Sequence, residues 1–393
     1  MTMSVATRRV LLLDEEQDEF RSSVKAFARP FTETYLPLAH SDQFPWEENR
    51  ALGRQGLLGL GVSERFGGQG ATGGVDRVSV GVAVEELAYA NFYLSMLVFP
   101  SVMNGRLLEA HLAPELAEHW LPRLVRGELT ASFALTEPAA GSDVANLATR
   151  ARRVAGGWRI SGEKTSITSA PHASAFITMA VTDPERGAGG ITAFFVPRDS
   201  HGLSFQTFQD AGWRPLGRGA IGYQDVFVPD NQVLGPVGGA FRTVMRGFDF
   251  GRALIGLTVV GAARRALDMT VEHVRERYAF GGPIAGQQGV SFPVAEHATR
   301  LEAATWLSYR ALALGDADLP HTKEAAMVKW WAPEVAIDTV RDCVVLNGHG
   351  AFTEELPFQA LLRDVSAFQL ADGTAQIQKT VIARQLIGRR YTG

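Results

Sequence analysis

Asp372 is an acidic residue whose neighbours suggest either a structural or a chemical role. It lies in the stretch AFQLADGTAQIQK, residues 367–379, between an apolar run and a glycine that is typical of a turn. Its carboxylate could cap the helix predicted to follow, since aspartate is among the favoured N-cap residues. It could instead act as a general base, which requires a carboxylate in a water-poor pocket with a raised pKa. The local residues leave both interpretations open.

A second candidate stretch is FALTEPAAGSD, residues 133–143. A predicted strand leads directly into Thr-Glu-Pro and then into Ala-Gly-Ser-Asp. Small residues and two hydroxyls at a strand end would let backbone N–H groups approach an oxygen-rich ligand. The local residues alone favour a simpler interpretation, an ordinary turn with a helix N-cap at Ser142 or Asp143.

The sequence shows neither a Rossmann-type dinucleotide fingerprint nor a metal-binding motif. The glycine-rich stretch GLLGLGVSERFGG, residues 56–68, has helical flanks and lacks the βαβ context of a dinucleotide fingerprint. The sequence contains no P-loop, no HExxH and no G-x-S-x-G, and its nine histidines show no paired metal-ligand spacing. Cys343 is the only cysteine, which excludes an internal disulfide and a cysteine-rich metal site. The sequence therefore predicts no metal.

Three zones with different hydrophobic patterns must position these residues. Helical periodicity dominates from about 12 to 128, and short β-branched and aromatic runs follow from about 129 to 236. Gly156-Gly157 is a good hairpin connection within the second zone. Four long helical patterns fill the rest of the chain and suggest an antiparallel bundle. We expect domains at 1–128, 129–238 and 239–393.

Bulk composition narrows the class of protein. The 393 residues are 46% hydrophobic and 20% charged, with a formal net charge of −4. No dense Lys/Arg run appears, so nucleic acid is not an expected partner. No stretch approaches the roughly 18 apolar residues of a membrane span, and the apolar run before Asp14 is too short for a signal h-region. These features predict a soluble, cytoplasmic protein.

Three ordered motifs resemble the acyl-CoA dehydrogenase family of flavoproteins. TEPAAGSD resembles its first signature, RERYAFGGPIAGQQGVSF (275–292) its Arg-x-x-Phe-Gly…Gln segment, and VVLNGHGAF (344–352) with RDVSAFQLADGTAQIQK (363–379) its second signature. The resemblance covers nearly the whole chain. It implies an N-terminal α-helical domain, a central β-barrel and a C-terminal four-helix bundle, with FAD between barrel and bundle. It also implies a homotetramer, or at least a dimer.

The resemblance also implies roles for individual residues. Flavin contacts fall on two strands, at Phe133, Leu135, Thr136, Ser166 and Thr168. Contacts from a second subunit fall on Arg277, Phe280, Gln288 and the loop from Val344 to Gly348. Thr374 and Gln376 lie at a helix start that would face the pyrophosphate, where free N–H groups and the helix dipole favour phosphate. Contacts to an acyl thioester fall on Ser142, Asp249, Arg252 and Gly373.

Asp372 falls where the family commonly carries its catalytic glutamate. The implied reaction is α,β-dehydrogenation of an acyl-CoA or acyl-carrier-protein thioester. Asp372 would remove the α-proton, flavin N5 would accept the β-hydride, and an electron-transferring flavoprotein would reoxidise the cofactor. Backbone N–H at Asp372 would polarise the thioester carbonyl.

Two departures from the family pattern keep alternatives open. Aspartate is shorter than glutamate by about one C–C bond, ~1.5 Å, and Gly251, a position that carries the base in some members, cannot act. The usual aromatic residue beside the flavin is Ser166 here. An aspartate base resembles the nitroalkane oxidases, so a flavin oxidase or monooxygenase on the same scaffold is one alternative. A non-catalytic flavin-binding relative is another.

Overall fold

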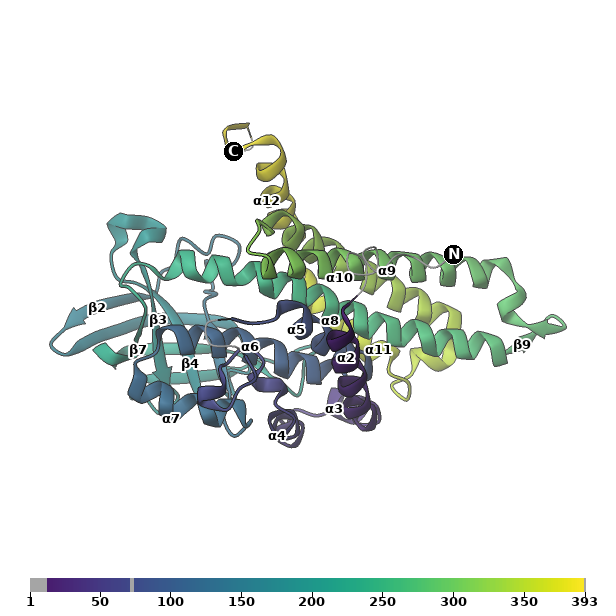
Figure 1. Ribbon diagram of the computed structural model, residues 1–393, viewed down its shortest axis with the longest axis horizontal. Helices are drawn as coiled ribbons and strands as arrows, with labels where there is room; N and C mark the ends of the chain where they lie inside the picture. Colours follow the sequence, from purple (N-terminus) through teal and green to yellow (C-terminus); the bar gives the residue numbers. More distant parts are fainter. Residues whose placement is uncertain (1–12, 71–73, 392–393) are drawn as a thin grey trace. The chain divides into compact units, whose positions relative to one another are not determined.

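The computed structural model describes residues 13–70 and 74–391, and its first part is helical. Figure 1 shows this part at the purple and blue end of the chain. Asp14 caps the first helix through a reciprocal capping box with Gln17, and Asp76 caps another by accepting from the Ser79 backbone N–H at 2.9 Å. The helices are α2 (Glu15–Ala28), α3 (Tyr35–Ala39), α4 (Trp46–Arg54), α5 (Arg77–Ala90), α6 (Phe92–His111) and α7 (Pro114–Val125).

A mixed eight-stranded sheet follows the first helices. Its path is β6-β7-β3-β2-β4-β5-β8, and β1 pairs with β4 in parallel. The strands are β1 (Ala131–Ala134), β2 (Arg150–Val154), β3 (Gly157–Thr168), β4 (Ala175–Val181), β5 (Ile191–Pro197), β6 (Leu203–Thr207), β7 (Arg218–Pro229) and β8 (Val233–Leu234).

The predicted hairpin joins β2 to β3. Val154 pairs with Gly157, so Ala155 and Gly156 form the two-residue turn, and Gly156 has φ +73°. Beyond this hairpin, β2 meets β4 at a single parallel pair, Arg150 with Val181. Apart from β1, which pairs with β4 in parallel, the sheet therefore consists of two antiparallel groups of strands that join at this point.

Strand β4 is buried along its whole length because both of its faces are covered. Ile177 and Met179 belong to a core that includes Leu108 of α6 and Leu121 of α7, and Figure 1 shows these two helices beside the sheet. Phe176 belongs to a second core, with Phe194, Ile221 and Val226. Alternate residues of one strand thus serve two cores, which gives β4 an almost continuous apolar sequence.

Long helices return after the sheet, as their periodicity predicts. They are α8 (Ala240–Glu276), α9 (Gln288–Asp316), α10 (Thr322–Asn347), α11 (Phe358–Ser366) and α12 (Ala375–Ile387), with a short hairpin of β9 (Tyr278–Ala279) and β10 (Gly282–Pro283) between α8 and α9. Among the described residues, no helix combines the length and hydrophobicity needed to cross a lipid bilayer.

The chain divides into two compact units by its internal contacts. The first unit contains the described residues among 1–36, 76–95 and 252–366, and the second contains those among 37–75, 96–251 and 367–393. Both α6 and α8 run from one unit into the other, and α12 belongs to the second unit rather than to the group of α9, α10 and α11. The three domain boundaries read from the sequence stay a prediction, because this division follows contacts and not chain order.

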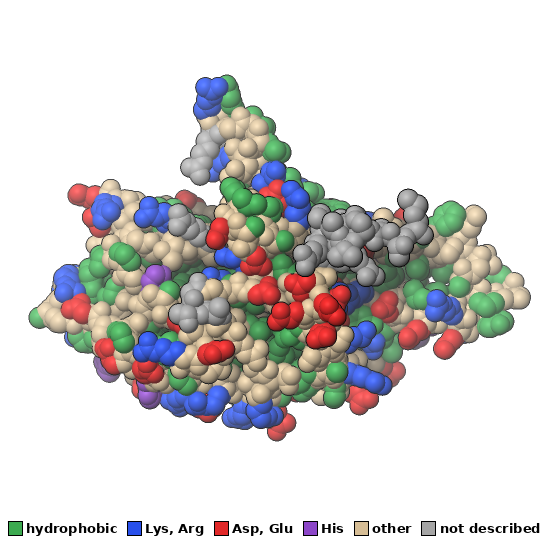
Figure 2. Space-filling model, viewed as in Figure 1, with side chains coloured by type: hydrophobic (Ala, Val, Ile, Leu, Met, Phe, Trp, Pro, Cys, Tyr) green, Lys and Arg blue, Asp and Glu red, His purple; other side chains and the backbone are tan. Residues whose placement is uncertain are grey.

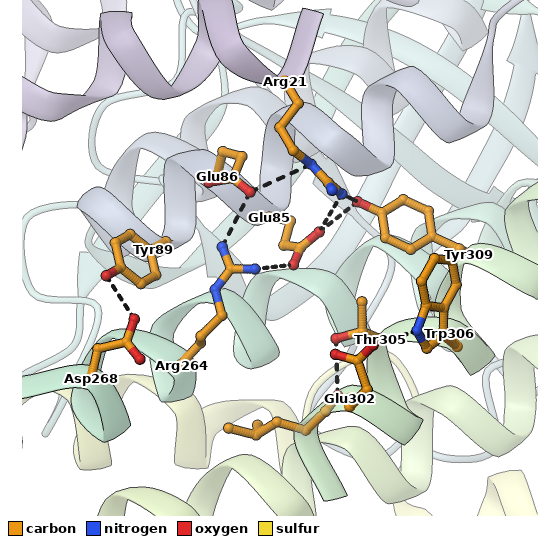
Figure 3. Close-up of polar contacts among 11 residues, drawn as sticks. Arg21, Glu85, Glu86, Tyr89, Arg264, Asp268, Glu302, Thr305, Trp306 and Tyr309 are labelled. Carbon is orange, nitrogen blue, oxygen red and sulfur yellow. Dashed lines mark hydrogen bonds and ion pairs between the residues drawn. The ribbon is translucent and has the colours of Figure 1, made fainter. Parts of the chain in front are cut away.

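Helices of the first unit are tied by a buried charge network (Figure 3). Glu85 and Glu86 of α5 are only 1% and 5% exposed. The Arg264 guanidinium of α8 reaches Glu85 at 2.6 Å and Glu86 at 3.2 Å, and Arg21 of α2 lies 3.4 Å from Glu85. The Tyr309 hydroxyl of α9 donates to Glu85 at 2.5 Å. The Glu85 carboxylate thereby links four helices, and its charge is compensated by two arginines and one tyrosine hydroxyl.

Candidate active site

Asp372 lies in the turn that directly precedes α12. Its side chain is exposed in the single chain, and its backbone is left-handed, with φ +53°. Gly373 is also left-handed, with φ +92°. Aspartate tolerates this region better than most residues with a side chain, although the conformation still costs free energy.

Asp372 is not the N-cap of the helix, so the capping interpretation is wrong. The N-cap is Thr374, whose backbone is extended at φ −61° and ψ 163°, and α12 begins at Ala375. The two left-handed residues turn the chain before the cap. The carboxylate consequently sits outside the helix, on the turn that leads into it.

The segment before Asp372 is anchored by a buried aromatic residue. Phe368 is buried and contacts Trp213 edge to face, with ring centroids 4.9 Å apart. The chain between Phe368 and α12 is therefore fixed at both of its ends within the second unit.

The structure brings the two predicted flavin-contacting segments together. The Thr165 backbone N–H donates to the Thr136 carbonyl at 2.9 Å, and the Ser132 hydroxyl donates to the Thr168 carbonyl at 2.8 Å. Strand β3 shifts register against β7 between Lys164 and Ile167, and Ser166 lies within this irregularity with φ +57°. The bulge leaves the Ser166 side chain exposed at the rim of the sheet.

A buried ion pair involves Lys164, two residues before Ser166 in β3. The Lys164 ammonium donates to Glu137 at 2.7 Å and to the Leu135 carbonyl at 2.9 Å. Burial lowers the pKa of Lys164 to about 8, while its bond to Glu137 opposes the fall. Burial raises the pKa of Glu137, but hydrogen bonds from Lys164, Thr149 and Ala148 outweigh it and hold that pKa below its ordinary value. Both groups are therefore charged at neutral pH.

The TEPAAGSD stretch forms a turn, but no helix follows it. Glu137 and Ala140 exchange backbone hydrogen bonds at 3.3 and 3.1 Å, and the residues from 141 to 149 are irregular. The expected N-cap at Ser142 or Asp143 is therefore wrong. The Glu137 carboxylate accepts the Ala148 and Thr149 backbone N–H groups, which holds this segment in an irregular conformation. The Ser142 side chain is exposed.

The remaining predicted residues lie on α8 and in the first unit. Asp249 is buried and Arg252 half-buried, three residues apart on α8. Arg277 and Phe280 belong to the segment of the β9–β10 hairpin, and Gln288 is the first residue of α9. All three are exposed, Phe280 to 96%. Val344 is half-buried in the last turn of α10, and Gly348 ends that helix with φ +66°.

Donor groups on the sheet rim and at the start of α12 fit a flavin dinucleotide. Within the described part of the chain, the hydroxyls of Thr136, Ser166 and Thr168 make no side-chain hydrogen bond to protein. These hydroxyls match the polar edge of an isoalloxazine ring. At α12, the Thr374 side chain makes no capping bond, which leaves the first N–H groups of the helix for an anion.

Sequence reasoning missed three side chains that shape the site. Lys164 and Glu137 pair across 27 residues, and only an isolated lysine in a β-branched run, EKTSIT, hints at its burial. Gln378 is fully buried in α12, although it follows an ordinary helical pattern. Its amide donates to the carbonyls of Asp372 and Gly373.

Comparisons with known proteins cover nearly the whole chain. Residues 14–128, 132–226 and 238–387 match the family models of the acyl-CoA dehydrogenase N-terminal, middle and C-terminal domains. An acyl-CoA dehydrogenase of Bacillus subtilis is 32% identical over 380 residues, which are 95% of this chain and 98% of that protein.

Solved structures of related enzymes share the fold. Butyryl-CoA dehydrogenase from Megasphaera elsdenii is 28% identical with a TM-score of 0.90, covering 98% of this chain and 100% of that one. An FAD complex of PigA is 26% identical with a TM-score of 0.90, covering 99% and 100%. The prolyl acyl carrier protein oxidase AnaB is 25% identical with a TM-score of 0.88, covering 95% and 99%.

The predicted fold class is confirmed: a helical N-terminal part, a central β part and a helical C-terminal part in the acyl-CoA dehydrogenase arrangement. The cofactor is FAD, as the sequence motifs predict. The chain belongs to the acyl-CoA dehydrogenase family of FAD-dependent oxidoreductases.

Proposed function

We propose that the chain catalyses α,β-dehydrogenation of an acyl thioester, with Asp372 as the base that removes the α-proton. The conformation of Asp372 carries this proposal. A left-handed backbone costs a residue with a side chain about 1–2 kcal/mol, and Thr374 already occupies the N-cap. An exposed carboxylate kept at such a position has a purpose other than capping.

The chain's own groups supply the proton chemistry. The Asp372 carboxylate takes the α-proton, and the Asp372 backbone N–H polarises the thioester carbonyl as negative charge develops on its oxygen. Bound FAD supplies the acceptor, N5, for the hydride that leaves the β-carbon. Because the side chain is ~1.5 Å shorter than glutamate, the substrate must approach the Asp372 turn more closely than a glutamate base would require.

The rim of the sheet supports a flavin site in the second unit. We assign the ring contacts to Phe133, Leu135, Thr136, Ser166 and Thr168, and the pyrophosphate to the α12 N-terminus at Thr374 and Gln376. Ser142, Asp249, Arg252 and Gly373 are assigned to the thioester and its carrier. Both coenzyme A and a carrier protein end in the same phosphopantetheine thiol, so these residues suit either carrier.

A second subunit completes the cofactor site in this proposal. Arg277, Phe280, Gln288, Val344 and Gly348 would contact the FAD of a neighbouring chain. Phe280 is 96% exposed and Tyr278 of the same hairpin is 69% exposed, which supports this, since exposed large apolar side chains that lie together mark an interaction surface. Figure 2 shows green and blue side chains on the C-terminal helix, where Leu386, Ile387 and Tyr391 are exposed. A homotetramer would cover both surfaces.

The decisive experiment is anaerobic titration of the purified protein with a panel of acyl thioesters while the flavin absorbance is recorded. We expect at least one thioester to bleach the flavin at a catalytic rate, with an electron-transferring flavoprotein as the subsequent acceptor. Complete failure of every thioester would favour a non-catalytic flavin-binding protein.

Asp372→Asn tests the base directly. The variant keeps the size of the side chain and tolerates the same left-handed backbone. Flavin reduction should slow about a hundredfold or more, which is the scale of general-base loss. FAD content and binding of substrate analogues should stay unchanged. Rapid flavin reduction in this variant would remove Asp372 from the mechanism.

A flavin oxidase is the second candidate, and Ser166 is the observation that favours it. Its small side chain sits exposed at the bulge of β3, where it would leave the flavin edge open to oxygen. The likeness to the AnaB oxidase points in the same direction. Stopped-flow mixing of reduced, product-bound enzyme with oxygen separates the two functions, because only an oxidase reoxidises rapidly.

A further inference from the structure

The Asp372–Gly373 turn is held by one side chain of the following helix. The Gln378 amide nitrogen donates to the Asp372 carbonyl at 3.2 Å and to the Gly373 carbonyl at 3.3 Å. Only the NH₂ end of an amide can face two carbonyl oxygens, so this contact fixes the orientation of the side chain. Gln378 is 0% exposed.

Gly373 is shaped to admit that amide. A Cβ atom at Gly373 would lie 2.5 Å from the Gln378 amide nitrogen, and the backbone there has φ +92°. Any other residue would both strain the turn and displace the amide. Gly373 and Gln378 therefore depend on each other: the glycine leaves room for the amide, and the amide holds the carbonyls of Asp372 and Gly373.

The backbone of Gln378 is held by the first turn of α12. Its backbone N–H donates to the Thr374 carbonyl at 3.0 Å, in the first turn of α12. Its amide oxygen is buried and has no hydrogen-bond partner among the described residues. A buried, unpaired carbonyl oxygen is unfavourable, and an apolar side chain of similar size would avoid it. Helix packing alone does not explain a glutamine at this position, whereas its hold on the turn does.

We propose that Gln378 is a positioning residue that aims the Asp372 carboxylate. By fixing the carbonyls on either side of Gly373, it sets the rotation of the peptide after Asp372 and hence the direction of its side chain. This inference rests on the proposed role of Asp372 as the base. Gln378 touches neither substrate nor proton in this scheme. It governs the rate of α-proton removal, while binding of FAD does not depend on it.

The test compares Gln378→Leu with a matched control, Asn49→Leu. Asn49 is also buried, at 2% exposure, and its amide donates to the carbonyl of another left-handed glycine, Gly127, at 3.0 Å. The control removes the same kind of bond far along the chain from Asp372. We expect Gln378→Leu to slow single-turnover flavin reduction at saturating thioester tenfold or more, with FAD content within twofold of wild type. Asn49→Leu should lower the melting temperature while keeping the rate of flavin reduction.

Gln378→Glu supplies a readout that a purely structural role would not move. A carboxylate cannot donate to the two carbonyls, whereas a protonated carboxyl group can donate to one of them. The ratio of the variant rate to the wild-type rate should therefore rise as the pH falls through the pKa of the new carboxyl group. This variant also decides the matter if Gln378→Leu does not fold.

Two outcomes would overturn the inference. One is wild-type flavin reduction in Gln378→Leu, or a rate loss no larger than that of Asn49→Leu. The other is a rate ratio for Gln378→Glu that does not change with pH. Asp372→Asn, measured in parallel, separates the two proposals. If it reduces flavin rapidly, the function proposed for Asp372 fails; if it is slow while Gln378→Leu is fast, only the positioning role fails.

Discussion

At the scale of single residues, the left-handed Asp372 places a short carboxylate on a turn whose geometry is set by its neighbours. Gly373, Thr374 and Gln378 each restrict this turn in a different way. These three residues thus fix the backbone from which the carboxylate projects. Lengthening the side chain should shift the carboxylate without moving the turn.

Asp372→Glu tests that expectation. The extra methylene advances the carboxylate by ~1.5 Å, and a displacement of about 1 Å in a reacting group can cost a hundredfold in rate. We expect lower turnover on the native substrate and a relative gain on straight-chain acyl thioesters, because the reach of the usual glutamate is restored. Steady-state kinetics on a thioester panel measures this. An unchanged substrate profile in Asp372→Glu would show that reach does not select the substrate.

At the scale of elements, the Lys164–Glu137 pair joins β3 to the segment after β1, and its charges depend on pH. The pKa of Glu137 is lowered in the folded chain, so its stabilisation is present above the ordinary 4.5 and is lost as the pH falls through the folded value. The pKa of Lys164 falls from 10.5 to about 8, so the unfolded chain binds more protons between these values, and this group makes stability rise with pH there.

The double variant Lys164→Met/Glu137→Gln should lose both pH effects. Relative to it, the wild type should lose unfolding free energy below pH 4.5 and gain it between about pH 8 and 10.5. The single variant Lys164→Met leaves a buried carboxylate without its partner and should cost about 3–5 kcal/mol. Denaturant unfolding across pH measures these differences. Parallel pH curves for the wild type and the double variant would show that the pair does not titrate as described.

A second prediction at the scale of elements concerns the charge network of the first unit. Glu85→Gln removes the carboxylate that Arg21, Arg264 and Tyr309 share (Figure 3). Since both arginines are partly exposed, we expect a loss below the 3–5 kcal/mol of a fully buried pair, about 2 kcal/mol. Thermal melting measures it. The control is Glu302→Gln, which alters an exposed carboxylate that accepts the Trp306 ring N–H at 2.6 Å. This variant should melt within about a degree of wild type.

Sequence patterns predicted elements better than they predicted caps and buried partners. The hairpin at Gly156, the buried strand β4 and the long helices α8 to α10 follow from local periodicity and turn residues. The N-cap expected at Ser142 or Asp143 was wrong, and so was the capping alternative for Asp372. In both places, side chains that are distant or later in the sequence form hydrogen bonds with the backbone. Glu137 binds the N–H groups of Ala148 and Thr149, and Gln378 binds the carbonyls after Asp372. No local pattern encodes which side chain reaches such groups.

At the scale of the whole molecule, the exposed hairpin between α8 and α9 supports the proposal that the chain functions as an assembly. The last prediction concerns Arg277, which is exposed at the start of this hairpin and is assigned to the FAD of a neighbouring subunit. Arg277→Ala removes a charge-assisted contact to a phosphate. Because a ligand shared between subunits stabilises their association, FAD retention and subunit association should weaken together.

The control for Arg277→Ala is Arg275→Ala, which removes the same charge from an exposed position in the last turn of α8. Sedimentation at a series of protein concentrations gives the association state, and fluorescence of released FAD gives retention. We expect Arg277→Ala to dissociate and lose FAD at concentrations at which Arg275→Ala and the wild type do neither. A wild-type monomer that retains FAD and activity would refute the shared site. Equal losses in both variants would attribute the effect to general charge and not to a contact at Arg277.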